Sequence, residues 1–425
     1  MPTHENSYPP THFRARKERP WWHWRPSKLF YLRCLWCFLI FYQEFYLFKT
    51  AFKACYYDEW TSPALPTNAK IGLIGDPQLV DENTYARRGV ALAITKFYTD
   101  LYMRKNYKLL NRHFTFNTTI FTGDLFDGGR EWDDKTWAKE YQRFQKVFPQ
   151  RSSKHVITSM PGNHDIGFSD GVQTSVYKRF RQAFGETTQS FEVGAWEVVV
   201  LDTVAMSSPN AAVSKFPRDW LAKWQKAKSD KPKMLITHVP LYREPDAPCG
   251  PLRESNSSIK IQRGYQYQNV LDPAVSEEIW EIVKPSVIFA GDDHDYCDYQ
   301  HENGIHEFNV KTFSWAMGVK RPGFQMVSVS GTRYETKLCL LPGQLPIFGR
   351  YAAFLGITCL SLLILASRST QKRVEPGLPR TNKDDDNKRR TTTKRKPLHL
   401  LKVTARDLGL VAWPVLIYYL YMIWC

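Results

Sequence analysis

Short apolar segments in the middle of this chain are each followed at once by a polar loop, and this repeated arrangement limits the folds that the chain can adopt. The segments that read as strands are 70–75, 114–123, 155–162, 190–202, 233–238 and 286–291. Five of them end in the motifs GDPQ (75–78), GDLFDGGR (123–130), PGNHD (161–165), TH (237–238) and GDDHD (291–295). Core packing does not require polar motifs at successive strand ends, so the pattern indicates a common site.

Helix-like runs lie between these strands, at 84–104, 131–147, 216–228 and 274–284. Strands that alternate with helices predict an α/β sheet protein. Three further strands, near 304–311, 324–330 and 335–341, follow one another without helices. We expect this late run to form a second sheet packed against the first. An apolar fraction of 43% in 425 residues is typical of a folded protein with a large core.

The loops at the carboxyl ends of strands in α/β sheets converge on one crevice. Nine polar side chains would meet there, namely Asp76, Gln78, Asp124, Asp127, Asn163, His164, His238, Asp292 and His294. Such a crowd of carboxylates would raise its own pKa values unless cations lay between them. Carboxylates, imidazoles and an amide suit ions such as Mn²⁺, Zn²⁺ or iron, and two ions roughly 3.5–4 Å apart can clamp a reacting phosphoryl group. The motifs together predict a two-metal hydrolase, although Asp124 or His238 taken alone is more often a turn or structural residue.

The order of the motifs, GDxQ, GDxxDGGR, GNHD, TH and GDxHD, resembles that of the calcineurin-like metallophosphoesterases. That superfamily usually has the series DxH, GDxxD, GNH[DE], H and GHxH. The longer stretches GDPQLVDE, GDLFDGGREWDD, PGNHDIGF, THVPLYR and GDDHDYC are similar to a eukaryotic membrane-bound branch. That branch includes a fungal cell-division-control metallophosphoesterase and a GPI-anchor remodelling enzyme. The resemblance covers residues 70–342 and implies a double β-sheet sandwich flanked by helices.

The resemblance also implies which residues would bind metal. Asp124 would bridge both ions. The remaining ligands of the first ion would be Asp76, Gln78 and His294. Those of the second ion would be Asn163, His238 and Asp292. Gln78 and Asp292 stand where the general pattern has histidine, and oxygen ligands in place of imidazole favour Mn²⁺ over Zn²⁺.

Three residues near these ligands are candidates for catalysis. His164 would be the general acid that protonates the leaving alkoxide, with Asp127 holding its imidazole. Arg130 would hold a nonbridging phosphate oxygen. Two alternatives stay open, because Asp127 could simply cap the following helix and Arg130 could pair with an acidic neighbour at the surface. Asp165 and Asp295 could support the ligands or be plain surface acids.

Three apolar runs outside the central region predict membrane helices, at 29–48, 347–366 and 408–425. Each is about the length of a span, and the last could instead lie at the interface because it is rich in Trp and Tyr. In the first run, Arg33 and the pair Gln43 and Glu44 are costly unless they lie near an end. A cleaved signal peptide is disfavoured there, because the basic lead is long and no small-residue cleavage site follows.

Two basic segments, 1–28 and 367–407, carry most of the net charge of +16. Because excess Lys and Arg marks the cytosolic side of a membrane, we expect a cytosolic tail and a cytosolic loop at these positions. The linker 49–69 and the domain 70–343 would then be luminal. That domain is close to neutral, so nucleic acid is not an expected partner, although the basic loop read alone could be a nucleic-acid or nuclear-localisation patch.

A luminal domain would be open to glycosylation and oxidation. Its sequons begin at Asn117 and Asn256. The cysteines on the expected luminal side are Cys55, Cys249, Cys297 and Cys339. Disulfides are possible among these four in an oxidising compartment, but their pairing cannot be read from the sequence.

The resemblance and the expected topology together imply a phosphodiesterase of the endoplasmic reticulum membrane, or of the Golgi. It would remove ethanolamine phosphate from a mannose of the GPI-anchor glycan, with GPI-anchored proteins or their glycans as substrates. Two other functions stay open. One is a general luminal phosphatase or nucleotidase, and the other is a cargo-binding protein in which Gln78 and Asp292 mark a degenerate metal site. The sequence does not indicate an oligomeric state.

Overall fold

The computed structural model describes residues 27–55, 69–150, 155–227, 229–372 and 385–424. These residues form two compact units. The larger unit comprises the described residues of the range 42–353, and the smaller joins the described residues before Tyr42 to those from Phe354 onward. The predicted tail 1–28 lies almost wholly outside the described residues, as does much of the predicted linker 49–69.

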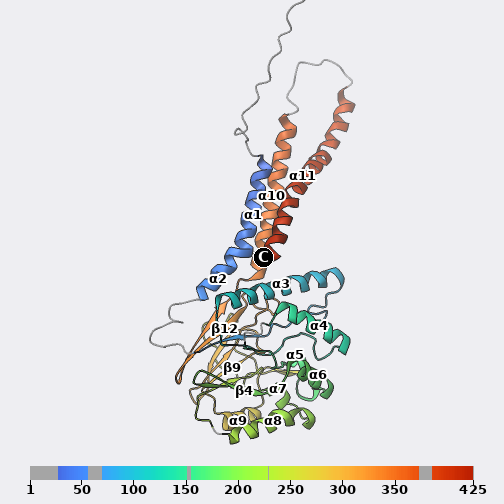
Figure 1. Ribbon diagram of the computed structural model, residues 1–425. Coiled ribbons are helices and arrows are strands. Elements are labelled where there is room, and N and C mark those ends of the chain that lie inside the picture. Colours follow the sequence, from blue (N-terminus) through green and yellow to red (C-terminus); the bar gives the residue numbers. More distant parts are fainter. Residues whose placement is uncertain (1–26, 56–68, 151–154, 228, 373–384, 425) are drawn as a thin grey trace, which may run out of the picture. The chain divides into compact units, whose positions relative to one another are not determined.

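Two β-sheets form the centre of the larger unit (Figure 1). The five-stranded sheet has the order β13 (Arg333–Leu340), β12 (Gly323–Ser330), β1 (Ala69–Ile74), β2 (Thr118–Phe121) and β3 (His155–Ile157). The six-stranded sheet has the order β10 (Cys297–Gln300), β11 (His306–Asn309), β9 (Val287–Ala290), β6 (Lys233–Ile236), β5 (Trp196–Val200) and β4 (Gln189–Val193). Strands β1, β2 and β3 are parallel, as are β5, β6, β9 and β11, while the others pair antiparallel at the edges. The α/β fold with two sheets is therefore confirmed.

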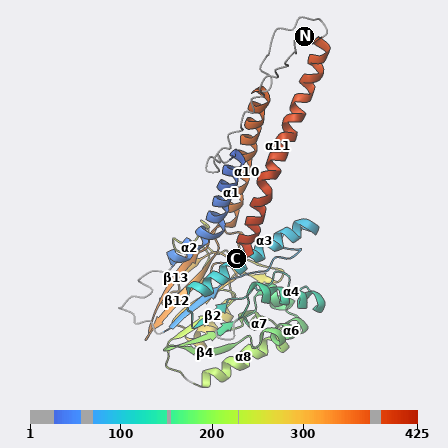
Figure 2. The same cartoon turned by 45° about the horizontal axis from the view of Figure 1, so that its top comes forward.

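Helices cover the outer faces of both sheets. Figure 1 shows α3 (Gly89–His113) and α4 (Asp134–Val147) on one side, and α8 (Ala211–Lys226) and α9 (Pro273–Val283) on the other. The turned view of Figure 2 shows the same layers, with α8 beside β4. Shorter helices lie in the connections, namely α5 (Asn163–Ile166), a 3₁₀ turn (Ser169–Gly171), α6 (Thr174–Phe184) and α7 (Thr203–Met206). A two-stranded hairpin, β7 (Arg263–Gly264) and β8 (Tyr267–Gln268), stands apart from the main sheets.

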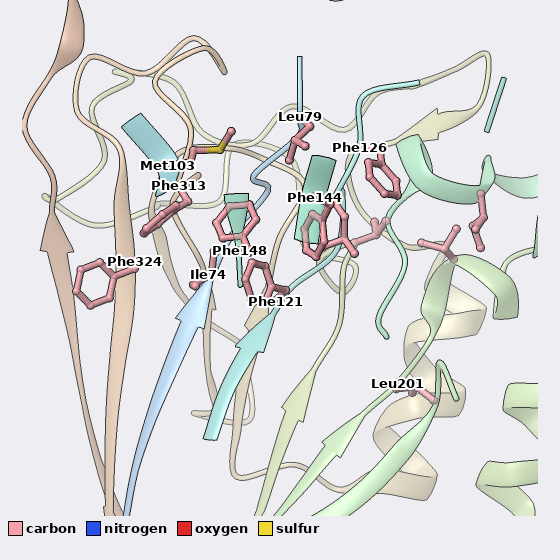
Figure 3. Close-up of a cluster of buried hydrophobic side chains, with 14 of the residues drawn as sticks. Ile74, Leu79, Met103, Phe121, Phe126, Phe144, Phe148, Leu201, Phe313 and Phe324 are labelled. Atoms are coloured by element: carbon pink, nitrogen blue, oxygen red, sulfur yellow. The ribbon is translucent and has the colours of Figure 1, made fainter. Parts of the chain in front are cut away.

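Alternating side chains along each strand build two cores. Val198 and Val200 of β5 join the cluster between the sheets, whereas Val199 joins the cluster under the helices. The cluster under the helices is rich in phenylalanine. Figure 3 shows Phe121, Phe144 and Phe148 gathered near the end of β2. Their rings meet mostly edge to face. The central parallel strands β5, β6 and β9 are buried on both faces, which explains why they read as largely apolar runs in the sequence.

Three details differ from the sequence-based expectation. The late strands β12 and β13 do not form the second sheet, because β12 pairs with β1 and extends the first. The single strand expected at 190–202 is a hairpin of β4 and β5, turned at Gly194, whose φ of 61° suits glycine. Helix α6 was not expected, yet it has a buried face, formed by Val176, Tyr177 and Phe180.

The larger unit begins with a helical segment that packs into its core. A π-helical turn (Tyr42–Tyr46) leads into α2 (Leu47–Cys55). Phe48 and Phe52 of α2 are fully buried in the cluster under the helices, and a disulfide joins Cys55 to Cys339 of β13. The second disulfide joins Cys249 to Cys297. All four cysteines of the expected luminal side are therefore paired.

The polar pair in the first apolar run has partners within the larger unit. Gln43 Oε1 accepts a hydrogen bond of 2.9 Å from Arg350. The carboxylate of Glu44 accepts from the Tyr351 hydroxyl at 2.8 Å and from Lys105 at 2.9 Å. These bonds compensate the burial of the Glu44 carboxylate and of Gln43 Oε1, whereas Gln43 Nε2 has no partner among the described residues.

The smaller unit contains α1 (Lys28–Phe41), all of α11 (Asp385–Trp424) and most of α10 (Gln344–Lys372). Arg33 donates to the carbonyl of Leu410 at 2.7 Å, so the basic group inside the first apolar run has a partner. Gln344–Arg368 and Leu398–Trp424 are long and apolar enough to cross a membrane. Membrane association of the chain follows from these helices, while a span at 29–48 and the exact segment boundaries stay predictions.

Candidate metal centre

The five motif loops meet between the ends of the two sheets. Three follow β1, β2 and β3 of the first sheet, and two follow β6 and β9 of the second. His238, after β6, crosses between the sheets, because its Nδ1 lies 2.8 Å from the carbonyl of Thr122 at the end of β2. Nδ1 therefore carries the proton and donates it to that carbonyl, which leaves the lone pair on Nε2.

Three predicted ligands surround His238 Nε2. Their oxygens are Asn163 Oδ1 at 3.2 Å, Asp124 Oδ1 at 3.4 Å and Asp292 Oδ1 at 3.7 Å. His238 and Asn163 are buried, so this group lies inside the protein rather than on its surface. A lone pair facing three oxygens at these distances forms a cluster of donors that suits a divalent cation.

A second group of donors adjoins the first. Asp76, Asp124 and His294 each offer one atom, and these atoms lie within 4.8 Å of one another. Asp76 Oδ1 accepts from the backbone N–H of Asp292, but the buried Oδ2 has no hydrogen-bond partner among the described residues. Gln78 is buried on the same loop, and its Oε1 also lacks a partner in the described part of the chain. Orphaned buried oxygens next to carboxylates fit a bound cation, which would satisfy them.

The electrostatics of the site lead to the same conclusion. Burial, followed by the neighbouring Asp124, raises the pKa of Asp76 and of Asp292 well above the usual aspartate range. Burial lowers the pKa of His238, and it lowers that of His294 to about 4, so both imidazoles stay neutral and able to coordinate. Several like charges held apart from water require a compensating positive charge.

The backbone is strained at the predicted ligands. Positive φ angles occur at five of them, namely Asp76 (35°), Gln78 (39°), Asp124 (47°), Asp292 (70°) and His294 (60°). Non-glycine residues rarely adopt this region, and each such residue costs of order 1–3 kcal/mol. Half of the ten non-glycine residues with positive φ in the described chain are therefore predicted ligands, which indicates that the fold sacrifices stability to aim these side chains.

Glycine at position 162 permits the closest approach of two loops. A Cβ atom there would lie 2.0 Å from Asp124 Oδ1 and 2.4 Å from the Asp124 nitrogen. Only glycine lets the PGNHD loop pass so close to the GDLFD loop, which explains the Gly-Asn-His order in physical terms.

His164 and Asp127 are in contact, as the sequence analysis expected. His164 Nδ1 lies 2.7 Å from the Asp127 carbonyl and 3.2 Å from Asp127 Oδ1. Nδ1 therefore donates to Asp127 and leaves Nε2 free, on a side chain that is partly exposed. Burial alone would lower the pKa of His164, but the carboxylates of Asp124 and Asp127 raise it to about 9.

The Arg130 side chain contacts the PGNHD loop rather than extending into open solvent. Its Nη1 donates to the carbonyl of Asn163 at 3.0 Å, and its Nε lies 3.6 Å from Glu131. The guanidinium is thus fixed beside the predicted ligand Asn163, and the surface pairing with Glu131 occurs as well.

Two supporting residues were left open or missed by the sequence analysis. Asp165 is fully buried and accepts from the backbone N–H groups of Gly162, Leu125 and Phe126 at 2.9–3.1 Å, so it clamps the PGNHD loop to the GDLFD loop. The carbonyl of Gln266, between β7 and β8, accepts from Asn163 Nδ2 at 3.2 Å. That bond turns Oδ1 of Asn163 toward His238. No sequence signal connects a loop a hundred residues away to this amide.

Asp295 lies outside the ligand cluster. It accepts from Lys311 at 2.5 Å and from the backbone of Glu254 and Ser255 at 2.9–3.0 Å. Its carboxylate therefore ties three chain segments together beside the GDDHD loop and is not a plain surface acid.

The chain is similar in sequence to a known protein family and to proteins from several organisms. A model of the calcineurin-like phosphoesterase family matches residues 69–296. Cell division control protein 1 of Saccharomyces cerevisiae is 37% identical over 346 residues, which cover 75% of this chain and 70% of that protein. Metallophosphoesterase 1 of Ailuropoda melanoleuca is 26% identical over 354 residues, covering 77% of this chain and 86% of that protein.

Among solved structures, a dimetal phosphatase from Danio rerio is 14% identical, with a TM-score of 0.39, and the match covers 65% of this chain and 99% of that one. The family match spans more than half of the chain and contains all the motif loops. The chain therefore belongs to the calcineurin-like phosphoesterases, a family of metal-dependent phosphoesterases, and is related to cell division control protein 1 and metallophosphoesterase 1.

Proposed function

We propose that this protein is a two-metal phosphodiesterase. The observation that carries the proposal is the position of Asp124, which belongs to both donor groups, one with Asp76 and His294 and one around His238 Nε2. A carboxylate shared between two groups of donors is what a pair of adjacent cations needs.

The two sites would draw on the predicted ligands. Asp76, Gln78 and His294 would hold one ion, and Asn163, His238 and Asp292 the other, with Asp124 between them. Because four of these six unshared ligands offer oxygen, Mn²⁺ is the favoured metal. When bound, the ions would activate the attacking water and neutralise the charge of the phosphoryl group.

The remaining residues would position the phosphoester and move a proton. The free Nε2 of His164 would donate a proton to the leaving alkoxide, while Asp127 fixes the imidazole through Nδ1. Arg130 would contact a nonbridging oxygen with the N–H groups that the Asn163 carbonyl leaves free.

We infer that the substrate is the GPI-anchor glycan, from which the enzyme removes ethanolamine phosphate on a mannose. The relationship to the membrane-bound branch supports this substrate. Membrane association through Gln344–Arg368 and Leu398–Trp424 supports it too, because the catalytic unit is then tethered near lipid-anchored molecules. The disulfides Cys55–Cys339 and Cys249–Cys297 favour an oxidising compartment such as the endoplasmic reticulum.

Mass spectrometry of GPI glycans tests this substrate. Cells that lack the protein should accumulate anchors with one additional ethanolamine phosphate, and the wild-type chain should restore the normal glycan. Asp124→Asn should not restore it, because the shared ligand loses its charge. Asp219→Asn is a matched control with the same chemical change on the exposed face of α8, and it should restore the glycan fully.

Unchanged glycans in the deletion cells would refute the GPI substrate. Hydrolysis of nucleotides by the purified protein, without activity on GPI glycans, would instead assign a general phosphatase. Full restoration by both His164→Ala and Asp124→Asn would point to a cargo-binding role without catalysis.

A further inference from the structure

The first half of α3 presents apolar side chains to the outside of the catalytic unit. Val90, Ile94 and Phe97 are 76%, 53% and 45% exposed, and their spacing places them on one face of the helix. The opposite face of this half holds the buried Thr95 and Thr99, and the core residues of α3 begin only at Leu101. In an ordinary soluble helix the distribution is reversed, with apolar residues inside and polar residues outside.

The exposed apolar surface extends beyond these three residues. No residue from Tyr85 to Ile94 is buried, and the six residues Gly89–Ile94 carry no charge. Leu345, in the first turn of α10, is 63% exposed. We call Val90, Ile94, Phe97 and Leu345 the α3 surface.

The α3 surface adjoins the point where the chain enters a candidate membrane helix. Phe348, one turn after Leu345, packs edge to face on Tyr98 of α3 and on Trp315. Tyr98 in turn contacts Phe97. These contacts lie within the larger unit, and the candidate span Gln344–Arg368 continues from the same turns of α10.

Charge at the start of the helix suits a lipid headgroup layer. Arg87 and Arg88 directly precede the uncharged run, and both are exposed. Arginine beside exposed Leu, Ile, Val and Phe is typical of helices that lie in the membrane interface, where the cation meets phosphate and the apolar face meets acyl chains.

A short loop connects this helix to the proposed acid pair. The Thr84 hydroxyl donates to Asp127 Oδ2, and the Tyr85 hydroxyl donates to the carbonyl of Ala316. Asp81, which lies in the same loop as Thr84, accepts hydrogen bonds from Thr84 and from Trp132. Four residues separate Thr84, at the site, from Gly89, where α3 begins.

We propose that the α3 surface inserts into the interfacial layer of a phospholipid bilayer. It thereby holds the metal centre beside phosphoesters whose carriers are anchored in that bilayer. The membrane contact itself does not depend on the substrate, whereas its benefit for catalysis rests on the proposed GPI function.

A spin label at position 94 tests the membrane contact. The full chain, with Cys34, Cys37, Cys359 and Cys425 replaced by serine, would carry Ile94→Cys in vesicles of phosphatidylcholine and phosphatidylinositol. Lys223→Cys on the exposed face of α8 is the matched control. We expect the label at 94 to collide more with oxygen than with a water-soluble nickel chelate, and the label at 223 to show the reverse.

Two results would overturn the membrane contact. Equal access of the nickel chelate to both labels would mean that the α3 surface lies in water. Protection of the label at 94 from both reagents would mean that protein, either a second copy or another partner, covers the surface.

The catalytic consequence is tested with the same phosphoester in two forms. The double variant Ile94→Glu and Phe97→Glu should lower hydrolysis of a vesicle-embedded GPI glycolipid at least about tenfold, since one buried apolar side chain already has an effect of this size. Hydrolysis of the water-soluble glycan released from its lipid should stay within about twofold. Equal loss on both forms would contradict the proposal.

Failure of the GPI function is distinguishable from failure of this inference. If the wild-type protein hydrolyses neither form, the substrate assignment is wrong, and the collision data at position 94 still decide whether the α3 surface meets lipid.

Discussion

His238 Nε2 lies 3.4 Å from Asp124 Oδ1, although the two residues follow strands of different sheets. His238 Nδ1 also donates a hydrogen bond to the carbonyl of Thr122, at the end of β2 in the first sheet. The candidate metal centre is therefore a junction between the two sheets as well as a site of chemistry. Removing its cations should loosen the contact between the layers.

Metal removal should lower the thermal stability of the protein. Chelation leaves Asp76, Asp124 and Asp292 close together and buried without a counter-charge, so we expect the melting temperature to fall by several degrees. Differential scanning fluorimetry of the detergent-solubilised chain, with and without added Mn²⁺, measures this change. Asp124→Asn should respond to Mn²⁺ much less than Asp219→Asn, and equal responses of the two variants would argue against the site.

Loss of His164 should depend on the leaving group of the substrate. A sugar alkoxide needs a proton as it departs, whereas p-nitrophenolate does not, so His164→Ala should reduce kcat on a sugar phosphodiester by about 10²–10⁴-fold. The reduction on a p-nitrophenyl ester should be much smaller. A uniform loss on both substrates, or loss of bound metal by elemental analysis, would assign His164 a structural role instead.

Asp202 should make stability dependent on pH. This side chain is fully buried, caps α7 through Ala205 N–H at 2.8 Å, and has a pKa that burial raises to about 6. Between about pH 4 and 6 the folded state binds the proton more tightly than the unfolded state, so this residue's contribution to stability falls as pH rises. The raised pKa of Asp202 corresponds to a loss of roughly 3 kcal/mol from the free energy of unfolding by pH 7.

Asp202→Asn keeps an oxygen for the cap but removes this titration. The variant should therefore gain stability over the wild type as the pH rises from 4 to 7, measured by urea unfolding. Parallel curves for the two proteins would show that the carboxyl does not titrate in this range.

Glycosylation should mark the side of the membrane on which the catalytic unit lies. Asn256 is exposed on a polar loop, so a luminal domain should carry a glycan there. Wild-type protein from eukaryotic cells should shift in mobility on treatment with an endoglycosidase, and Asn256→Gln should lose one such shift. A chain without any shift, combined with a cytosolic protease-sensitive domain, would reverse the expected topology.

The catalytic loops were predictable because each one directly follows an apolar strand, and the order of strands in a parallel sheet brings their ends together. That rule brings Asp76 and Asp124 together at the end of the first sheet, whereas His294 follows β9 of the second sheet and its approach depends on how the two sheets pack. The pairing of β12 with β1 was not predictable, since an antiparallel strand can join either sheet without changing its sequence pattern. Register and sheet order depend on packing of the whole domain rather than on local sequence.

The supporting residues were hidden for a different reason. Asp165 looks like any acid in a loop, and only the three N–H groups around it distinguish it. Gln266 acts through its backbone carbonyl, so its side chain carries no signal at all. Phe48 ends the predicted apolar run 29–48 and Phe52 falls in the predicted linker 49–69, yet both pack in the core of the catalytic unit.

The Cys55–Cys339 bridge has a mechanical consequence. Cys55 ends α2, and Cys339 lies five residues before α10 begins. The bond joins two positions 284 residues apart and closes most of the larger unit into a covalent ring. Tension applied through the chain on either side would pass from one sulfur to the other. The hydrogen bonds of β1 and β13 are thereby shielded from pulling forces, and lateral drift of the flanking helices would not unzip the sheet.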